Sequence, residues 1–334
     1  MRQTTPTGRQ IAVSGVRPTG ELHIGNYLGA IKQFIKLQEQ YKTYFFIADL
    51  HALTEPRDPK IFSDQALDIA VLYLACGLNP KKTTLFIQSH IPQHLELANI
   101  LSALTPVGEL SRMTQYKEKV AEGASANLGL FAYPVLMAAD ILIYKAHGVP
   151  VGEDQFQHLE FARTIARKFN NQFGEVFPEP KAIVPPEGTE RLKSLADPIK
   201  KMSKSGSENN YIGLLDDETE IKRKIKIAVT DSGKEIKFDP AAKPAISNLL
   251  TIYSQMADIP INELEKKYTG KSYVEFKNDL ADMLVAKLTP IQKKYKELAK
   301  DKESVLEILK KGAEEARGIA ESTMRDVRQK VGFL

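Results

Sequence analysis

The chain has 334 residues, of which 43% are apolar and 26% charged, and its net charge is +4. These values are typical of a folded protein with a sizeable core, so they exclude a disordered chain, while the mild positive charge permits a polyanionic partner without requiring one. The single cysteine, Cys76, excludes an internal disulfide and a metal site made of cysteines alone, and its apolar neighbours predict a core position.

The sequence contains no pattern typical of a targeting or membrane segment. Its first ten residues are polar, and no apolar run reaches the length needed to cross a bilayer. We therefore expect a cytoplasmic protein with no membrane partner.

A glycine turn follows the first strand-like segment. Residues 14–26 read Ser-Gly-Val-Arg-Pro-Thr-Gly-Glu-Leu-His-Ile-Gly-Asn, which predicts a strand, a turn and the first turn of a helix. Backbone N–H groups and the helix dipole favour phosphate at such a place. Gly15 and Gly20 have the spacing of P-loop glycines, but Glu21 stands where that motif needs its lysine, so a P-loop is excluded.

Three residues at the end of this segment are candidate nucleotide contacts. His23 and Asn26 would add side-chain donors to the backbone donors around a phosphate, and Gly25 would let the nucleotide approach closely. The structural alternative is a capped strand–helix junction with a surface histidine.

Short apolar runs alternate with helical patterns through the first half of the chain. The strand candidates are rich in β-branched and aromatic residues and span residues 11–16, 44–48 and 84–88. Helical patterns lie between and after them, at about residues 24–40, 60–76 and 92–104. Pro59 and Pro92 suit first helical positions. This alternation predicts a doubly wound parallel sheet with ligands at the carboxyl ends of its strands, after Val16 and Ala48.

The next part of the chain, residues 109–170, is predicted to be helical with a break at 148–152, and it contains an unusual stripe. Tyr133, Met137 and Asp140 fall at i, i+4 and i+7, so they share one helix face. An unpartnered carboxylate among apolar neighbours is costly or has a raised pKa, which favours a ligand pocket in which Met137 packs on an aromatic ring and Asp140 accepts its N–H. The structural alternative is a basic partner for Asp140 at an interface.

A polar loop past the middle of the chain carries two lysines. Residues 201–205 read Lys-Met-Ser-Lys-Ser. Attack of a carboxylate on the α-phosphate of ATP expels pyrophosphate, and mobile lysines such as Lys201 and Lys204 can close on the charge that develops. A solvated basic loop is the structural alternative. Prolines between 178 and 186 indicate an irregular connection before this loop, and from about 216 onward only helical patterns appear.

Residues 14–26 resemble the "HIGH" signature of the class I aminoacyl-tRNA synthetases, and residues 201–205 resemble their "KMSKS" signature. Further segments are similar to the bacterial tryptophanyl-tRNA synthetases, and these lie at residues 108–119, 137–142, 149–155, 197–205, 214–217, 228–232 and 243–250. The resemblance implies a ligase that activates L-tryptophan with ATP to tryptophanyl-adenylate and pyrophosphate. The tryptophanyl group would then pass to tRNA(Trp).

The resemblance also implies roles for individual residues. Asp140 would bind the indole nitrogen, Tyr133 and Gln155 the α-amino group, and Met137 the ring, with Val13 and Gly15 as further contacts of tryptophan. The implied ATP site consists of Arg17, Pro18, Thr19, Gly25, Asn26, Gly152, Glu153, Asp154, Leu192, Lys201, Met202, Ser203, Lys204 and Ser205. The implied catalytic residues are His23, Asn26, Lys119, Lys201 and Lys204, of which the three lysines would meet the phosphates.

Three positions depart from the family pattern. Close relatives often carry an aromatic residue at the position of Val13, glutamine at Arg17 and threonine at His23. Arg17 could add a contact to the substrate carboxylate or to phosphate.

The implied fold class is α/β, a Rossmann-like doubly wound parallel sheet with a helical insertion and a C-terminal all-α domain. The catalytic sheet domain would span 10–108 and 181–215, the insertion with the amino-acid pocket and the dimer interface 109–180, and the anticodon-binding domain 216–334. The implied phosphate contacts of that last domain are Lys222, Arg223, Lys224, Lys226, Lys266, Lys267, Lys293 and Lys294, which without the family would be taken for a solvated helix surface. A homodimer is expected, with Mg²⁺ held by ATP oxygens and water and no metal site in the protein.

Alternatives remain at this point. A tyrosyl-tRNA synthetase shares fold and motifs, but residues 137–142 argue against it. A catalytically idle paralogue that binds tRNA would not need both lysines of the loop. A nucleotidyltransferase related to pantothenate ligase could share the first turn but would not need the long helical tail.

Overall fold

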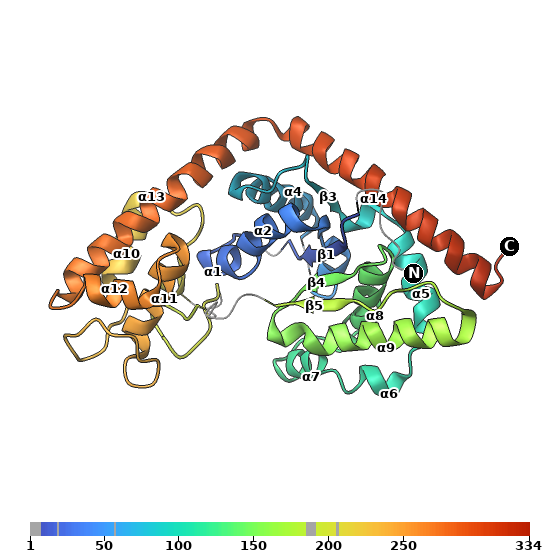
Figure 1. Cartoon of the computed structure of the whole chain (residues 1–334), viewed down its shortest axis with the longest axis horizontal. Helices are drawn as coiled ribbons and strands as arrows, with labels where there is room; N and C mark the ends of the chain where they lie inside the picture. The colour runs from blue at the N-terminus through green and yellow to red at the C-terminus, as the bar shows by residue number, and fades with distance from the viewer. Residues whose placement is uncertain (1–7, 19, 57, 185–191, 205–206) are drawn as a thin grey trace. The chain divides into compact units, whose positions relative to one another are not determined.

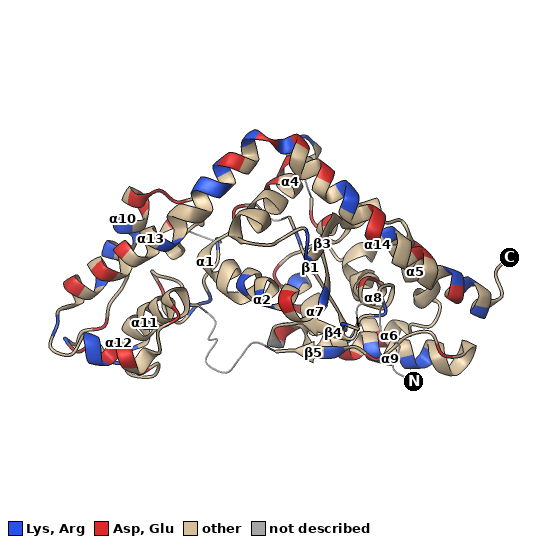
Figure 2. Cartoon of the chain, turned by 45° about the horizontal axis from the view of Figure 1, so that its top comes forward, with Lys and Arg blue, Asp and Glu red and all other residues tan. Residues whose placement is uncertain are grey.

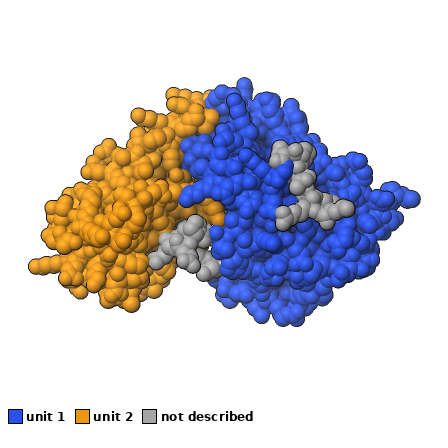
Figure 3. Space-filling view, viewed as in Figure 1, with its two compact units in different colours: residues 1–20, 34–185, 301–334 blue, residues 21–33, 186–300 orange. Residues whose placement is uncertain are grey.

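The computed structural model of the chain forms two compact units, which Figure 3 shows in different colours. Unit 1 contains residues 1–20, 34–185 and 301–334, and unit 2 contains residues 21–33 and 186–300. The structure describes residues 8–18, 20–56, 58–184, 192–204 and 207–334.

Unit 1 is built on a five-stranded sheet in which all neighbouring strands are parallel, in the order β3-β2-β1-β4-β5 (Figure 1). The strands are β1 (Ile11–Val16), β2 (Lys42–Ile47), β3 (Thr83–Ile87), β4 (Gly148–Pro150) and β5 (Lys181–Ile183). The first three confirm the predicted strands. The short strands β4 and β5 were not predicted. The three residues of β4 include a glycine and a proline and resemble a break, and β5 has only three residues and lies within the proline-rich connection between residues 178 and 186. The strand order reverses between β1 and β4, which is where such sheets bind ligands.

Helices of unit 1 surround this sheet. They are α2 (Lys32–Gln40, which begins in unit 2), α3 (Asp49–Ala52), α4 (Pro59–Cys76), α5 (Gln93–Ser102), α6 (Val107–Leu110), α7 (Thr114–Ala121), α8 (Leu128–Leu142), α9 (Phe156–Phe173) and α14 (Lys302–Val331). Pro59 is the first residue of α4, as predicted, and Asp58 caps it by accepting the N–H of Lys60. Pro92 lies one residue earlier than predicted, at the N-cap of α5. Cys76 is buried, as expected.

The last helix, α14, belongs to unit 1 and packs on β3. One of its faces is formed by small residues, and Gly312, Ala313, Ala316 and Ala320 are all buried there. Lys, Arg, Asp and Glu are interspersed along the rest of the helix (Figure 2). The predicted division placed all of 216–334 in one helical domain. The structure instead groups residues 301–334 with the sheet, because the small-residue face lets α14 approach β3 closely.

Unit 2 is helical in the part that the structure describes, which confirms the pattern from 216 onward. It contains α1 (Ile24–Asn26), a π-helical turn (Tyr27–Ile31), α10 (Glu218–Ile227), α11 (Pro244–Ala257), α12 (Ile261–Lys267) and α13 (Tyr273–Lys300). Leu249, Leu264, Phe276, Leu280 and Leu284 are buried in its core. Among the described residues of both units, no helix has the length and apolar character needed to cross a bilayer. The predicted α/β class, with a Rossmann-like sheet, a helical insertion and a helical C-terminal part, is confirmed.

Candidate active site

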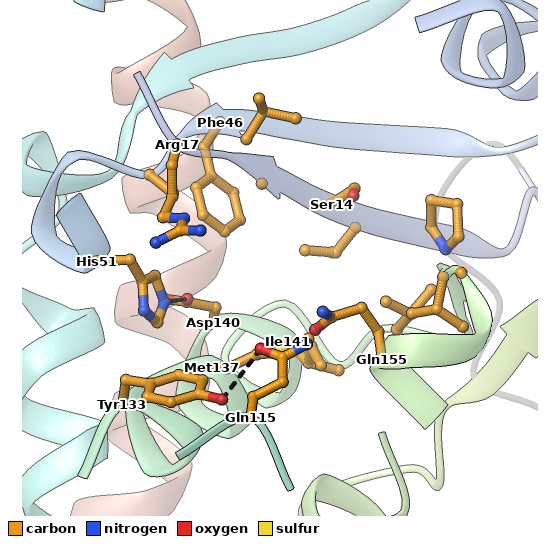
Figure 4. A pocket seen from close by; sticks show the side chains of 18 of the residues that line it. Ser14, Arg17, Phe46, His51, Gln115, Tyr133, Met137, Asp140, Ile141 and Gln155 are labelled. Carbon is orange, nitrogen blue, oxygen red and sulfur yellow. Dashed lines mark hydrogen bonds and ion pairs between the residues drawn. The ribbon is translucent and has the colours of Figure 1, made fainter. Parts of the chain in front are cut away.

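A cavity of about 400 Å³ opens in unit 1 at the carboxyl ends of β1, β2 and β4. Its walls come from segments far apart in the sequence (Figure 4). The lining residues with polar side chains are Ser14, Arg17, His51, Thr54, Gln115, Lys119, Tyr133, Asp140 and Gln155. The cavity therefore lies where the strand order predicts a ligand site.

Helix α8 brings the predicted stripe to this cavity. The helix begins after Asn127, whose side chain accepts the N–H of Leu130. Tyr133, Met137 and Asp140 then follow on one face, and all three line the cavity. The helical spacing read from the sequence thus corresponds to a shared surface in the structure.

Asp140 is buried and held by three donors. Its Oδ2 lies 2.7 Å from Nε2 of His51, and its Oδ1 lies 2.8 Å from Nε2 of Gln88 and 2.5 Å from Nδ1 of His94. Burial alone would raise the pKa of Asp140, but the charges and hydrogen bonds of His51 and His94 lower it well below its usual range. The expectation of an unpartnered carboxylate with a raised pKa was wrong. Its basic partners, His51 and His94, lie in the same unit.

The geometry of Asp140 still leaves room for a ligand. A carboxylate offers about four acceptor positions, two on each oxygen. In the described residues, two donors occupy Oδ1 and one occupies Oδ2. About one position on Oδ2 therefore remains for a donor that enters the cavity.

Tyr133 forms a second polar corner of the cavity (Figure 4). Its hydroxyl donates to Oε1 of Gln115 over 3.2 Å and lies 2.6 Å from Nε2 of His158. Burial raises the pKa of Tyr133, so the phenol is neutral, and burial lowers the pKa of His158 to about 4. Gln155 lines the same cavity, and its amide donates to Asp154. His158 and Gln115 were missed by sequence reasoning, although His158 follows Gln155 by three residues, a helical spacing.

Two cations at the cavity share one carboxylate. Nζ of Lys119 lies 2.6 Å from Oε1 of Glu55, and a guanidinium nitrogen of Arg17 lies 3.5 Å from the same oxygen. Glu55, in the turn after α3, was not singled out in the sequence. Lys119 was predicted to meet phosphate, and Arg17 the substrate carboxylate or phosphate; in this structure both pair with Glu55.

Gly15 and Val13 shape one wall of the cavity. A Cβ built on Gly15 would lie within van der Waals overlap of the Phe46 ring, since Cε2 would be 2.3 Å away. The glycine therefore lets the Phe46 ring pack across β1. Val13 is buried and lines the same cavity as Phe46.

Unit 2 holds the other signature residues. His23 caps α1, where its Nδ1 accepts the N–H of Gly25 over 3.1 Å and Oδ1 of Asn26 accepts the N–H of His23 over 3.0 Å. The sequence left open a capped strand–helix junction with a surface histidine as the structural alternative. The junction is indeed capped, but His23 is buried. Burial lowers the pKa of His23 to about 4, and the charges of Lys204 and Lys201 act in the same direction.

The "HIGH" turn and the "KMSKS" loop meet inside unit 2. A Cβ on Gly25 would lie 3.6 Å from Sδ of Met202, and the N–H of Met202 donates to the carbonyl of Leu192 over 3.0 Å. Burial also lowers the pKa of Lys204, with Glu21 opposing this shift. Ser203 belongs to the same loop and is partly buried.

A buried ion pair supports the segment that pairs with this turn. The N–H of Ile24 donates to the carbonyl of Ile212 over 2.9 Å, and Asp216 accepts the N–H of Gly213 over 2.8 Å. Nζ of Lys224 lies 2.7 Å from Oδ2 of Asp216 and 4.8 Å from the centre of the Tyr211 ring. Only 3% of the Lys224 side chain is exposed. The prediction of Lys224 as a tRNA phosphate contact was therefore wrong.

The remaining predicted residues are distributed as follows. Gly152 lines the cavity of unit 1, whereas Pro18 and Asp154 are not among its lining residues. Thr19 and Ser205 lie outside the described residues, and the side chain of Glu153 is not described either. Where the structure describes the chain, it contains no group of three or more His, Cys, Asp or Glu side chains placed to hold a metal ion.

Comparison with known proteins gives consistent matches over nearly the whole chain. The model of the family "tRNA synthetases class I (W and Y)" matches residues 5–289. A tryptophan–tRNA ligase of Caldanaerobacter subterraneus subsp. tengcongensis is 51% identical over 322 residues, which cover 96% of this chain and 98% of that relative. The crystal structure of tryptophanyl-tRNA synthetase from Mycoplasma pneumoniae aligns with a TM-score of 0.88 at 35% identity and covers 98% of both chains. The Campylobacter jejuni enzyme, complexed with ADP and tryptophan, aligns with a TM-score of 0.84 at 39% identity, over 97% of this chain and 100% of that one.

Proposed function

The chain belongs to the class I tRNA synthetases of the W and Y type, and we infer that it is a tryptophan–tRNA ligase. It activates L-tryptophan with ATP to tryptophanyl-adenylate and pyrophosphate, and then transfers the tryptophanyl group to tRNA(Trp). The observation that carries the choice of amino acid is the buried, ionised Asp140 in a cavity that also contains Met137. A fixed acceptor of this kind suits a ring N–H, and a site built to bond such a donor rejects a ring that lacks it.

Tryptophan is assigned to the cavity of unit 1. Oδ2 of Asp140 accepts the indole N–H, and Met137 lies against the ring. The neutral Tyr133 hydroxyl and the Gln155 amide oxygen accept from the α-ammonium group. Val13 and Gly15, with the Phe46 ring, form the wall behind the substrate.

ATP is the second substrate, and its phosphates are assigned to cations and to the capped turn. In His23, Nδ1 accepts a backbone N–H, so the neutral ring carries its proton on Nε2 and can donate it to a phosphate oxygen. Lys201 and Lys204 stabilise the charge that develops on pyrophosphate as it leaves. No protein nucleophile takes part, because the carboxylate of tryptophan attacks the α-phosphate.

The other predicted ATP contacts keep supporting roles in this proposal. Arg17 and Lys119 exchange the Glu55 carboxylate for phosphate when the nucleotide binds. Asn26 caps the turn, and Mg²⁺ is coordinated by phosphate oxygens and water. The other residues assigned to ATP are Pro18, Thr19, Gly25, Gly152, Glu153, Asp154, Leu192, Met202, Ser203 and Ser205.

The tRNA side of the proposal rests on the family. The helical part from residue 216 to 300 reads the anticodon, with exposed cations such as Lys266 and Lys293 on the phosphates. The chain acts as a homodimer with two-fold symmetry, and it works in the cytoplasm, where ribosomes consume charged tRNA.

Amino-acid-dependent exchange of pyrophosphate into ATP by the purified chain tests this function. We expect exchange with tryptophan and not with tyrosine, followed by esterification of tRNA(Trp). Exchange that responds to tyrosine alone would overturn the substrate. The absence of any exchange, with tRNA binding retained, would favour the idle paralogue.

A further inference from the structure

The proposed mechanism gives no role to His94, a buried histidine. His94 lies on α5, is completely buried and does not line the cavity. Its Nδ1 lies 2.5 Å from Oδ1 of Asp140, and its Nε2 lies 2.7 Å from the hydroxyl of Tyr144. Both ring nitrogens are thus occupied, in a chain that runs from Tyr144 to the carboxylate of the cavity.

The direction of the bond between His94 and Asp140 follows from the charge of the carboxylate. Asp140 is ionised and can only accept, so Nδ1 of His94 donates to it. Burial keeps the pKa of Tyr144 well above its ordinary value, so its hydroxyl retains the proton. The other ring nitrogen of His94, Nε2, is hydrogen-bonded to this hydroxyl.

Aromatic packing prevents the His94 ring from turning. The ring lies edge-on to Phe46, with centroids 5.7 Å apart and an interplanar angle of 65°. Tyr144 stacks on Tyr44, with centroids 5.0 Å apart and planes 9° from parallel. The hydroxyl of Tyr144 is thereby fixed, and so is the imidazole that is hydrogen-bonded to it.

The consequence concerns the orientation of Asp140. Gln88 and His94 together occupy both acceptor positions of Oδ1, which sets the rotation of the carboxylate about its last bond. The other oxygen, Oδ2, is then presented to the cavity beside His51 (Figure 4). Without His94, only Gln88 would hold Oδ1, and the carboxylate would be held less firmly in the orientation that the ligand needs.

We propose that His94 is a positioning residue that determines amino-acid specificity: the Tyr144–His94–Asp140 chain holds the carboxylate so that it selects a substrate ring with an N–H group. This inference rests on the proposed function, because it names the residue behind the same acceptor. His94 acts through Asp140 and touches no substrate atom itself.

The test compares two substrates that differ at the ring donor. They are L-tryptophan and benzothienylalanine, in which sulfur replaces the N–H, each assayed by pyrophosphate exchange with the full chain. We expect His94→Leu to reduce the preference for tryptophan by about tenfold or more, while the KM for ATP stays unchanged. His94→Asn keeps an N–H near the position of Nδ1 and should retain more of the preference. Tyr144→Phe should cause a smaller loss, since it removes only the hydroxyl that is hydrogen-bonded to Nε2.

The matched control is His90→Asn, an exposed histidine four residues earlier in the chain, which should leave the preference unchanged. If His94→Leu impairs both substrates equally, the residue only fills space and the proposal is overturned. If His94→Leu does not fold, His94→Asn and Tyr144→Phe decide, and an unchanged preference in both overturns the proposal. If the wild-type chain shows no exchange with tryptophan, the proposed function itself fails, and this inference fails with it.

Discussion

Gly312 of α14 lies so close to β3 that a Cβ at this position would be 2.0 Å from the carbonyl oxygen of Leu85. Real Cβ atoms do not approach an oxygen at such a distance, so the glycine is required by the packing of the C-terminal helix on the sheet. Glycine inside a helix costs about 0.5–1 kcal/mol relative to alanine. The close approach that it permits, with Ala313 and Ala316 buried beside it, offsets that cost.

The first prediction follows from this contact. Gly312→Ala should lower the free energy of unfolding of unit 1 by about 1–3 kcal/mol, because the helix must move away from the sheet. Gly318→Ala is the matched control in the same helix, since a Cβ there meets nothing within 4 Å. It should stabilise the chain by up to about 1 kcal/mol. Denaturant unfolding of the two variants checks this, and equal effects would contradict the packing argument.

The strands and the pocket stripe could be predicted because their information is local. The strands β1 to β3 are continuous apolar runs, and Tyr133, Met137 and Asp140 are spaced by single helical turns. By contrast, the partners of Asp140 lie 89, 52 and 46 residues away along the chain. No periodicity in the sequence connects such distant positions. The sequence therefore predicted Asp140 as a site residue but not the histidines that keep it ionised.

Local composition did not predict which charged residues are buried, because their burial depends on tertiary contacts. Lys224 belongs to a run of basic residues that resembles a solvated surface. The fold buries it between Asp216 and the ring of Tyr211, a fact that only the packing of unit 2 determines. Similarly, the alternation of Lys and Glu continues without change from α13 into α14. The sequence pattern therefore does not show that the chain returns to unit 1 at residue 301.

The second prediction concerns the acceptor in the cavity. Asp140→Ala should raise the KM for tryptophan about a hundredfold or more, since the site loses its bond to the ring N–H. The KM for ATP should change little. Steady-state exchange kinetics at varied concentrations of each substrate measure both values. Equal increases in both would show that Asp140 acts on folding and not on recognition.

A third prediction uses the titration of His23. Its pKa is about 4 in the fold, below the ordinary value of 6.5, so the unfolded chain binds more protons between these pH values. Stability therefore rises with pH through this window, and about 2 kcal/mol is lost on going from neutral pH to pH 5. His23→Thr keeps a capping side chain but does not titrate. It should lose about 2 kcal/mol less over the same interval in denaturant unfolding, and an unchanged loss would place the titrating group elsewhere.

The fourth prediction concerns the carboxylate that pairs with both cations of the cavity. Glu55→Gln removes the charge that Lys119 and Arg17 share in this structure. Pyrophosphate, as an added inhibitor, should then bind several-fold more tightly, because phosphate no longer competes with a carboxylate. The effect should shrink in high salt. Inhibition constants measured at two salt concentrations check this, and weaker inhibition would mean that Glu55 orients the cations for phosphate.

The last prediction separates binding from chemistry at the lysine loop. Lys204→Ala should slow adenylate formation about a hundredfold to a thousandfold, since it removes a cation that stabilises developing charge. Tryptophan binding should persist, because the cavity of unit 1 does not contain Lys204. The chain has no tryptophan of its own, so the fluorescence of the added substrate reports this binding directly. Lys200→Ala, whose side chain is 79% exposed just before the loop, is the control and should leave both steps unaltered. A variant that loses binding and adenylate formation together would show that Lys204 supports the fold and does not act on the transition state alone.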